Sequence, residues 1–134
     1  RSSFGLGRLR QRHASYSCKA ARARLTHGLR NLFGDANEPT SIAFLLHLEQ
    51  VIAERRSEPA EGSYVASLFA KGINRIAQKV GEEAVEAVIG AKEPDIEAFQ
   101  SEAADLLFHY LVLLNEKGVS LGEIAETLAA LHKK

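Results

Sequence analysis

Residues 73–118 read INRIAQKVGEEAVEAVIGAKEPDIEAFQSEAADLLFHYLVLLNEKG and decide the fold. The apolar residues of this stretch recur at steps of three and four, which is the period of an amphipathic α-helix. Pro94 interrupts the pattern, and Asp95 follows with a side chain suited to cap a new helix. Gly118 is a residue type that commonly ends helices. The stretch therefore predicts two long helices whose short connection favours antiparallel packing.

Each of these helices carries an apolar stripe. The first stripe comprises Ile73, Ile76, Ala77, Val80, Ala84, Ala87, Val88 and Ala91. The second comprises Ile96, Phe99, Ala103, Leu106, Leu107, Tyr110, Leu113 and Leu114. Because a helix buries its apolar face, we expect the two stripes to pack against each other.

Shorter helices are expected on both sides of this pair. Thr40 or Ser41 can cap a helix over residues 44–56, and Ser63 can cap a short one that ends near Lys71 and Gly72. Ser120 can cap a last helix that bears the apolar residues Leu121, Ile124, Leu128 and Leu131. No segment alternates long enough to predict a strand, so the fold class is all-α, a bundle of roughly four to five helices over residues 39–134.

Composition agrees with one main domain. The chain has 134 residues, and 46% of them are hydrophobic, which suffices for a single core. Its single cysteine, Cys18, excludes an internal disulfide framework and fits a reducing compartment. No apolar run approaches the ~20 residues that a membrane span needs. We therefore expect a soluble, cytoplasmic protein that makes no contact with membranes.

Charge divides the chain into a basic arm and an acidic body. Residues 1–34 contain eight Lys and Arg and no acid, whereas residues 35–134 contain 17 acids and nine bases. We expect residues 1–38 to be irregular or partly helical; their composition also resembles a transit peptide. One alternative is a non-enzymatic helical module whose arm binds nucleic acid. Aromatic residues for base stacking are sparse there, so nucleic acid is not the expected partner.

The chemistry is concentrated in two acidic pairs. Glu83 and Glu86 are three residues apart on the first long helix, and Glu102 and Asp105 repeat the spacing on the second. Residues three apart share a helix face, and both pairs border the apolar stripes, so antiparallel packing should bring four carboxylates together. At ~5 Å and an effective dielectric of about 20, each like-charge pair costs roughly 3 kcal/mol. A divalent cation would offset this cost, and Mg²⁺ is favoured because it shares its shell with phosphates.

Neighbouring residues extend the candidate site. A metal-bound water needs a proton acceptor, for which Glu82 is the spare carboxylate. Lys71, Arg75 and Lys79 step by four towards Glu83 and would hold phosphate groups. Surface ion pairs along the helix, such as Lys79 with Glu83, are the alternative explanation for these basic residues.

His109 lies four residues beyond Asp105 on the same helix face. It could contact the substrate or donate a hydrogen bond to a ligating carboxylate. A buried histidine that is satisfied within the core is the equally weighted alternative.

Four stretches resemble a known family: FLLHLEQVIAERR (44–56), SYVASL (63–68), IAQKVGEEAVE (76–86) and EAADLLFHYLVLL (102–114). They are similar to phosphoribosyl-ATP pyrophosphatase, a member of the MazG-like all-α nucleotide pyrophosphohydrolases. The pattern of that family is ExxE followed by ExxD, which Glu83, Glu86, Glu102 and Asp105 match. The resemblance implies Mg²⁺-dependent hydrolysis of phosphoribosyl-ATP to phosphoribosyl-AMP and pyrophosphate, the second step of histidine biosynthesis.

The resemblance also bears on partners and alternatives. It implies a homodimer or a larger homo-oligomer in which helices of two chains build each site, and we expect Ser63 and Tyr64 to contact the substrate. A neighbouring possibility is a house-cleaning enzyme that hydrolyses noncanonical nucleoside triphosphates. In some organisms the domain follows a cyclohydrolase in one chain, so this sequence is plausibly a piece of such a fusion. Residues 13–18 (HASYSC) match the cyclohydrolase poorly, and we expect no cyclohydrolase activity.

Overall fold

A computed structural model describes residues 42–132, and within that range it contains helices and no strand. The predicted all-α class is therefore confirmed. The helices are α2 (Ala43–Ser57), α3 (Tyr64–Lys71), α4 (Ile73–Gly90), α5 (Ile96–Lys117) and α6 (Leu121–His132). The predicted arm, residues 1–38, and the predicted caps Thr40 and Ser41 lie outside the described residues.

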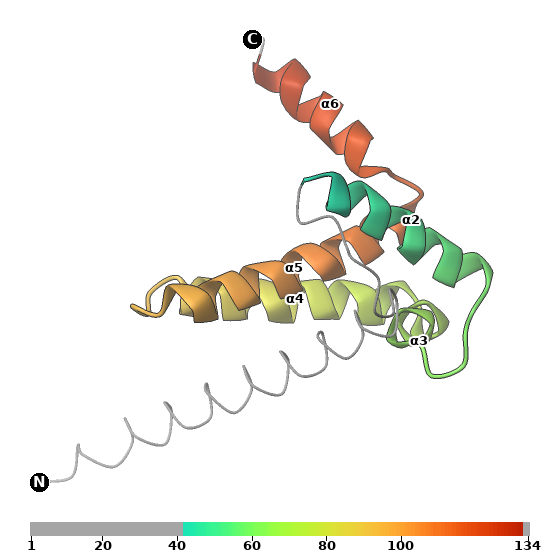
Figure 1. Ribbon diagram of the computed structural model, residues 1–134, viewed down its shortest axis with the longest axis horizontal. Coiled ribbons are helices and arrows are strands. Elements are labelled where there is room, and N and C mark those ends of the chain that lie inside the picture. The colour runs from blue at the N-terminus through green and yellow to red at the C-terminus, as the bar shows by residue number, and fades with distance from the viewer. Residues whose placement is uncertain (1–41, 133–134) are drawn as a thin grey trace, which may run out of the picture.

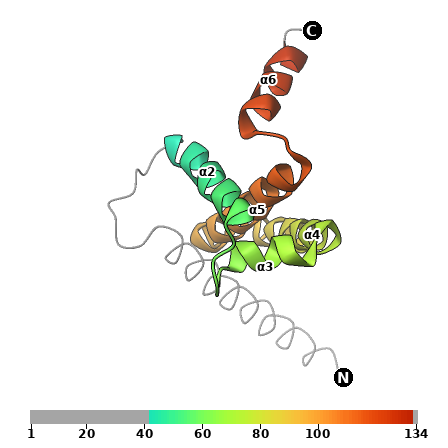
Figure 2. The ribbon, with the colours of Figure 1, turned by 90° about the vertical axis from the view of Figure 1, so that its right-hand side faces the viewer.

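Helices α4 and α5 form the long hairpin that the sequence predicts, and they run side by side in both views (Figures 1 and 2). Asp95 caps α5 by accepting a hydrogen bond from the Ala98 N–H at 3.0 Å. Gly118 ends α5 with a φ of +70°, which lets the Val119 N–H reach the carbonyl oxygen of Leu114 at 3.0 Å. Asp95 and Gly118 thus fix the two ends of α5, the helix that carries Glu102 and Asp105.

The short helix α3 is also bounded as predicted. The Ser63 hydroxyl accepts a hydrogen bond from the Ala66 N–H at 3.3 Å and so caps its start. Gly72 separates α3 from α4 with a φ of +81°, a backbone conformation that residues other than glycine rarely adopt. The chain therefore turns sharply at Gly72, and Lys71 stands on a different helix from Arg75 and Lys79.

The apolar core lies where α2 and α3 meet the hairpin, at the end opposite its turn (Figure 1). Helix α5 contributes the largest share of its residues, and α2 and α3 cover it. Its members are Leu48, Ile52, Val65, Leu68, Ile76, Phe108, Leu111, Val112 and Leu114. Burying one such side chain contributes about 1.5–3 kcal/mol, so this end supplies most of the stability.

Helix α6 extends away from the other helices (Figures 1 and 2) and contains no buried residue. Its start is nevertheless well capped: the Glu123 N–H donates to the Ser120 hydroxyl at 3.1 Å, and the Ser120 N–H donates to the Glu123 carboxylate at 2.7 Å. Leu128 and Leu131, two of the predicted apolar positions, are 63% and 61% exposed. The sequence thus predicted the helix correctly. It did not predict that part of the apolar face of this helix stays exposed in the single chain.

The predicted stripe of α4 needs a correction. Val88 is 60% exposed and Ile73 is 40% exposed, whereas Ile76, Glu83 and Ala87 are buried. The buried residues follow steps of seven and four, which trace one line along a helix. The side of α4 that faces α5 is therefore centred on Glu83, and the carboxylate lies within the buried line rather than beside it.

None of the described helices is long and apolar enough to cross a membrane.

Candidate functional site

The hairpin brings together the carboxylates that the sequence singled out. One carboxylate oxygen from each of Glu83, Glu86 and Glu102 can be chosen so that the three lie within 4.8 Å of one another. Two of these residues come from α4 and one from α5, so the antiparallel packing of the hairpin creates the cluster. Asp105 lies outside this group of three but is near enough for the charges of all three glutamates to act on it. Three of the four carboxylates that the sequence singled out are therefore grouped by distance.

Three of the four carboxylates are almost fully buried, and Glu86 is half-buried. Glu83 and Asp105 are each 2% exposed, and Glu102 is 5% exposed. Each of the three also has one buried oxygen, Oε2 or Oδ2, without a hydrogen-bond partner in the protein. Removing a charged oxygen from water without a partner costs several kcal/mol, so the arrangement calls for a cation. Oxygen ligands at this spacing suit a hard divalent ion.

The cluster changes the acidity of Asp105. Burial raises the pKa of its carboxyl to about 7 from an ordinary value of 3.8, and the negative charges of Glu83, Glu102 and Glu86 add to the effect. Burial beside three other carboxylates therefore favours the protonated form of Asp105. A bound cation would favour its ionised form.

Lys79 is the basic residue of the cluster. Its ammonium nitrogen Nζ lies 2.6 Å from Oε1 of Glu83 and 3.1 Å from Oε2 of Glu82, and its side chain is only 14% exposed. Burial by itself lowers the pKa of Lys79, but the hydrogen bonds to Glu83 and Glu82 outweigh it and raise the pKa. The lysine is therefore firmly charged and positioned at the edge of the acidic group.

Glu82 lies outside the buried cluster, on the exposed side of α4. Its carboxylate accepts hydrogen bonds from Gln78 at 2.8 Å and Lys79 at 3.1 Å, and Arg75 lies 3.7 Å away. The hydrogen bond from Lys79 is the main cause that lowers the pKa of Glu82. Arg75 and Lys79 thus converge on one exposed carboxylate beside the site, whereas Lys71 is an exposed residue at the end of α3.

Both ring nitrogens of His109 are used inside the chain. Nδ1 lies 2.8 Å from the carbonyl oxygen of Asp105, which can only accept, so Nδ1 carries the proton. Nε2 of the neutral ring then accepts from the Tyr64 hydroxyl at 2.8 Å. Burial lowers the pKa of His109, although the hydrogen bond to Asp105 acts in the opposite direction. This geometry matches the satisfied core histidine, because the bond goes to a backbone carbonyl and not to a ligating carboxylate.

Tyr64 and Ser63 therefore have structural partners in this chain. The Tyr64 hydroxyl links α3 to α5 through His109, and its ring stacks near Phe108 with centroids 6.4 Å apart. The Ser63 hydroxyl serves as the cap of α3. The Tyr64–His109 contact joins residues 45 positions apart, which no local spacing in the sequence could have indicated.

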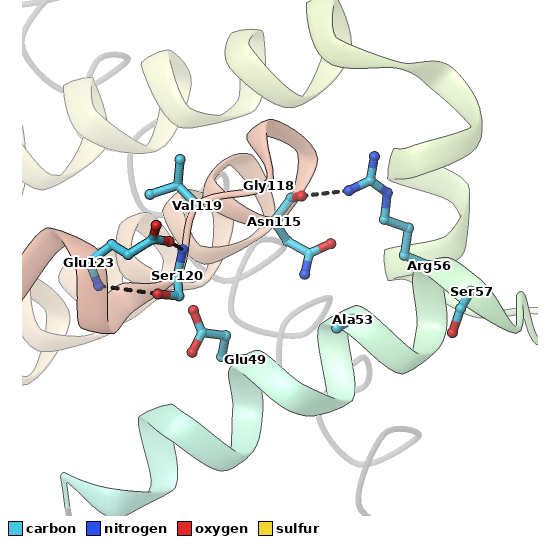
Figure 3. A pocket seen from close by; sticks show the side chains of 9 residues that line it. All are labelled: Glu49, Ala53, Arg56, Ser57, Asn115, Gly118, Val119, Ser120 and Glu123. Atoms are coloured by element: carbon cyan, nitrogen blue, oxygen red, sulfur yellow. Dashed lines mark hydrogen bonds between the residues drawn. The ribbon is translucent and has the colours of Figure 1, made fainter.

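The structure also contains a concave region that was not anticipated from the sequence. It encloses about 620 Å³ between α2 and the connection from α5 to α6 (Figure 3). Its lining residues are Glu49, Ala53, Arg56, Ser57, Asn115, Gly118, Val119, Ser120 and Glu123. Arg56 binds the carbonyl oxygen of Asn115 at 2.5 Å, and Glu49 accepts from the Leu121 N–H at 2.6 Å. These contacts attach α2 to the ends of α5 and α6, and no predicted site residue lines the region.

Comparison with known proteins places the acidic hairpin inside a described family. The family model described as phosphoribosyl-ATP pyrophosphohydrolase matches residues 45–132. A Histidine biosynthesis bifunctional protein HisIE from Vibrio cholerae is 46% identical over 100 residues, which are 75% of this chain and 48% of the relative. The protein of the same name from Escherichia coli K12 is 44% identical over 106 residues, 79% of this chain and 51% of the relative.

A third relative, the HisIE protein of Bacillus subtilis, is 42% identical over 120 residues. That similarity covers 90% of this chain and 53% of the relative, and it therefore extends into residues 1–41. The chain spans about half the length of the curated relatives it matches.

Proposed function

The chain belongs to the phosphoribosyl-ATP pyrophosphohydrolase family, and we propose that it hydrolyses phosphoribosyl-ATP to phosphoribosyl-AMP and pyrophosphate in histidine biosynthesis. The observation that carries the proposal is the burial of Glu83, Glu102 and Asp105 within the helices that the family model matches. Buried carboxylates with unpartnered oxygens reduce stability, which is difficult to explain except by a function that needs them.

Mg²⁺ is the cation that we propose for this cluster, with Glu83, Glu86, Glu102 and Asp105 as its ligands. The fit rests on the spacing of the carboxylate oxygens and on the buried oxygens of Glu83, Glu102 and Asp105 that lack hydrogen-bond partners. When bound, such an ion polarises phosphoryl oxygens and makes a coordinated water more acidic. Two packed helices of the protein, α4 and α5, supply these ligands.

The residues on the exposed side of α4 are assigned to substrate and proton handling. Arg75 and Lys79 would bind the phosphates that the cluster does not reach, and Glu82 would accept the proton of the attacking water. The support is proximity, since Lys79 contacts both Glu82 and Glu83, and Glu82 is 42% exposed at the side-chain level. Lys71, at the end of α3, is also proposed to contact the substrate. Ser63, Tyr64 and His109 remain proposed substrate contacts, and their side chains would have to give up hydrogen bonds within the chain to make them.

We also propose that the chain forms a homodimer or a larger homo-oligomer in the cytoplasm. Val85, Val88 and Ile89 on α4 and Ile96 on α5 are 51–64% exposed, so the hairpin presents apolar surface outside the acidic cluster. Surfaces of this kind are typical of contacts between proteins. Replacing Val88 by Glu should lower the molar mass measured by light scattering, whereas the exposed replacement Lys92→Glu should not.

The test of the activity is a direct comparison of substrates. The purified chain is incubated with Mg²⁺ and either phosphoribosyl-ATP or a panel of nucleoside triphosphates, and pyrophosphate release is measured. We expect turnover of phosphoribosyl-ATP to exceed the others by at least about tenfold in kcat/KM, about 1.4 kcal/mol. Equal or faster turnover of the triphosphates would instead assign the chain to nucleotide house-cleaning.

A further inference from the structure

Lys79 occupies an unusual position for a residue assigned to phosphate binding. Its ammonium contacts Glu83, a member of the carboxylate cluster, at 2.6 Å and is mostly shielded from water. Glu83 is itself buried, with its side chain 3% exposed. Lys79 is therefore the protein group that places a positive charge against this buried carboxylate.

A lysine and a divalent ion cannot share one carboxylate without cost. Oε1 of Glu83 faces Lys79, and Oε2 is the buried oxygen that lacks a hydrogen-bond partner. An ion held by the cluster through Glu83 would lie within a few ångströms of the ammonium, because the two oxygens belong to one carboxyl group. The two positive charges would repel each other in a site that little water can screen.

Glu82 offers the lysine an alternative position. Lys79 already contacts Glu82 at 3.1 Å, and Glu82 is 42% exposed, so a small rotation of the lysine side chain would leave the ammonium on Glu82 alone. Lysine has a long, flexible side chain with a compact charge, which suits such a movement. Arg75, 3.7 Å from Glu82, would stay in place.

We propose that Lys79 is a resident counter-ion of the metal site: it competes with the divalent cation for Glu83, and Glu82 receives it when the cation binds. The proposal rests on the metal site of the proposed function and adds a coupling to it. The metal ion alone binds weakly, because it must displace the lysine. A polyphosphate that arrives with the metal ion gives the displaced ammonium a new anionic partner, so ion and nucleotide favour each other's binding.

Calorimetric titration of the full chain with MgCl₂, without nucleotide, tests the competition. Lys79→Met should bind Mg²⁺ more tightly than the unmodified chain by about tenfold, within the range of about 5- to 150-fold typical of coupled sites. Arg75→Met removes the same charge from a residue whose ion pair, among the described residues, is with Glu82 and not with Glu83. It should change the affinity by less than about threefold. Equal or weaker binding by Lys79→Met, or equal gains in both variants, would overturn the proposal.

Lys79→Gln is the second variant, because its amide can still donate a hydrogen bond to Glu83 and so helps the fold to persist. Circular dichroism identifies the folded variants, and Lys79→Arg, which keeps the charge, should bind Mg²⁺ as the unmodified chain does. Absence of tightening in Lys79→Gln would count against the proposal even if Lys79→Met did not fold.

The role of Glu82 is tested by a double-mutant cycle. Glu82→Gln removes the alternative position of the lysine and should weaken Mg²⁺ binding by about threefold or more in the unmodified background. In the Lys79→Met background, Glu82→Gln should have little effect on Mg²⁺ affinity, because residue 79 no longer has an ammonium group that could pair with Glu82. An equal loss in both backgrounds would mean that Glu82 acts only through its charge and would contradict the proposed exchange.

The same titrations separate this inference from the proposed function. If the unmodified chain and Lys79→Met both bind no Mg²⁺, the metal site itself is wrong. If the unmodified chain binds Mg²⁺ through Glu83 and Lys79→Met binds it no better, only the counter-ion role is wrong.

Discussion

The two ends of the α4–α5 hairpin are built on opposite principles. At the end covered by α2 and α3, the interior is apolar, with Ile52, Leu111 and Val112 at most 1% exposed. Towards the turn, the buried line between the helices contains Glu83 and Glu102, while apolar residues such as Val88 face outwards. The end covered by α2 and α3 therefore stabilises the folded chain, whereas the buried carboxylates towards the turn destabilise it.

This contrast teaches where to look for function. A helix pair needs no buried carboxylates to pack, and apolar residues of similar volume would hold it together better. The acidic end can persist because the apolar end supplies stability in excess. Substitutions at the two ends should consequently separate activity from stability.

The largest expected effect is on activity, at the acidic end. Glu83→Gln should reduce the turnover of phosphoribosyl-ATP by at least about a hundredfold and abolish its dependence on Mg²⁺, because a neutral amide replaces a charged ligand. Steady-state kinetics across a Mg²⁺ series provide the measurement, and circular dichroism should show intact helices. Glu93→Gln, an exposed change near the hairpin turn, serves as the control; substantial activity in Glu83→Gln would remove this residue from the site.

The apolar end should show the complementary result. Leu111→Ala removes a side chain that is 1% exposed and should lower the free energy of unfolding by about 2–5 kcal/mol. Leu128→Ala on α6, where the side chain is 63% exposed, should cost less than about 0.5 kcal/mol. Urea denaturation measures the free energy of unfolding of both variants. Comparable losses in the two would show that burial in the described core does not account for the stability of the chain.

The pH dependence of the metal-free protein should expose the cost of the acidic end. Because folding raises the pKa of Asp105 from 3.8 to about 7, the folded chain binds a proton that the unfolded chain releases. The contribution of Asp105 to the free energy of unfolding is therefore complete below about pH 4. It is lost as the pH rises through 7, and the loss amounts to roughly 2–4 kcal/mol at most. Denaturation in chelator between pH 4 and 8 measures the loss, which Asp105→Asn should largely remove; an unchanged slope in that variant would assign the loss to other groups.

The smallest effect concerns the hairpin turn that joins the two acidic pairs. Asp95→Ala removes the cap on the Ala98 N–H and should cost about 1 kcal/mol, with little change in kcat/KM, because the packed helices keep the carboxylates in place. Thermal denaturation and kinetics of the same sample provide the measurement. Loss of activity larger than the loss of stability would show that the turn positions the site.

Much of the fold was predictable because local signals agreed with one another. Asp95, Ser63, Ser120 and Gly118 act at the helix ends where the sequence predicted caps and stops. The roles of His109 and Arg56 were not accessible in this way, because their partners Tyr64 and Asn115 are 45 and 59 positions away. Contacts at such distances depend on how the helices cross, which helical spacing does not specify.

The sequence by itself determined the class of structure and the chemistry of the hairpin: helical periods, capping residues and two acidic pairs, all of which depend on interactions within a few residues. Only the tertiary structure decided that Glu83 lies in the centre of the buried face of α4 and that Lys79 lies between two carboxylates. The physical reason is that burial is a property of packed surfaces. The rotation of α4 against α5 selects which side chains leave water, and with that it selects which charges need a partner.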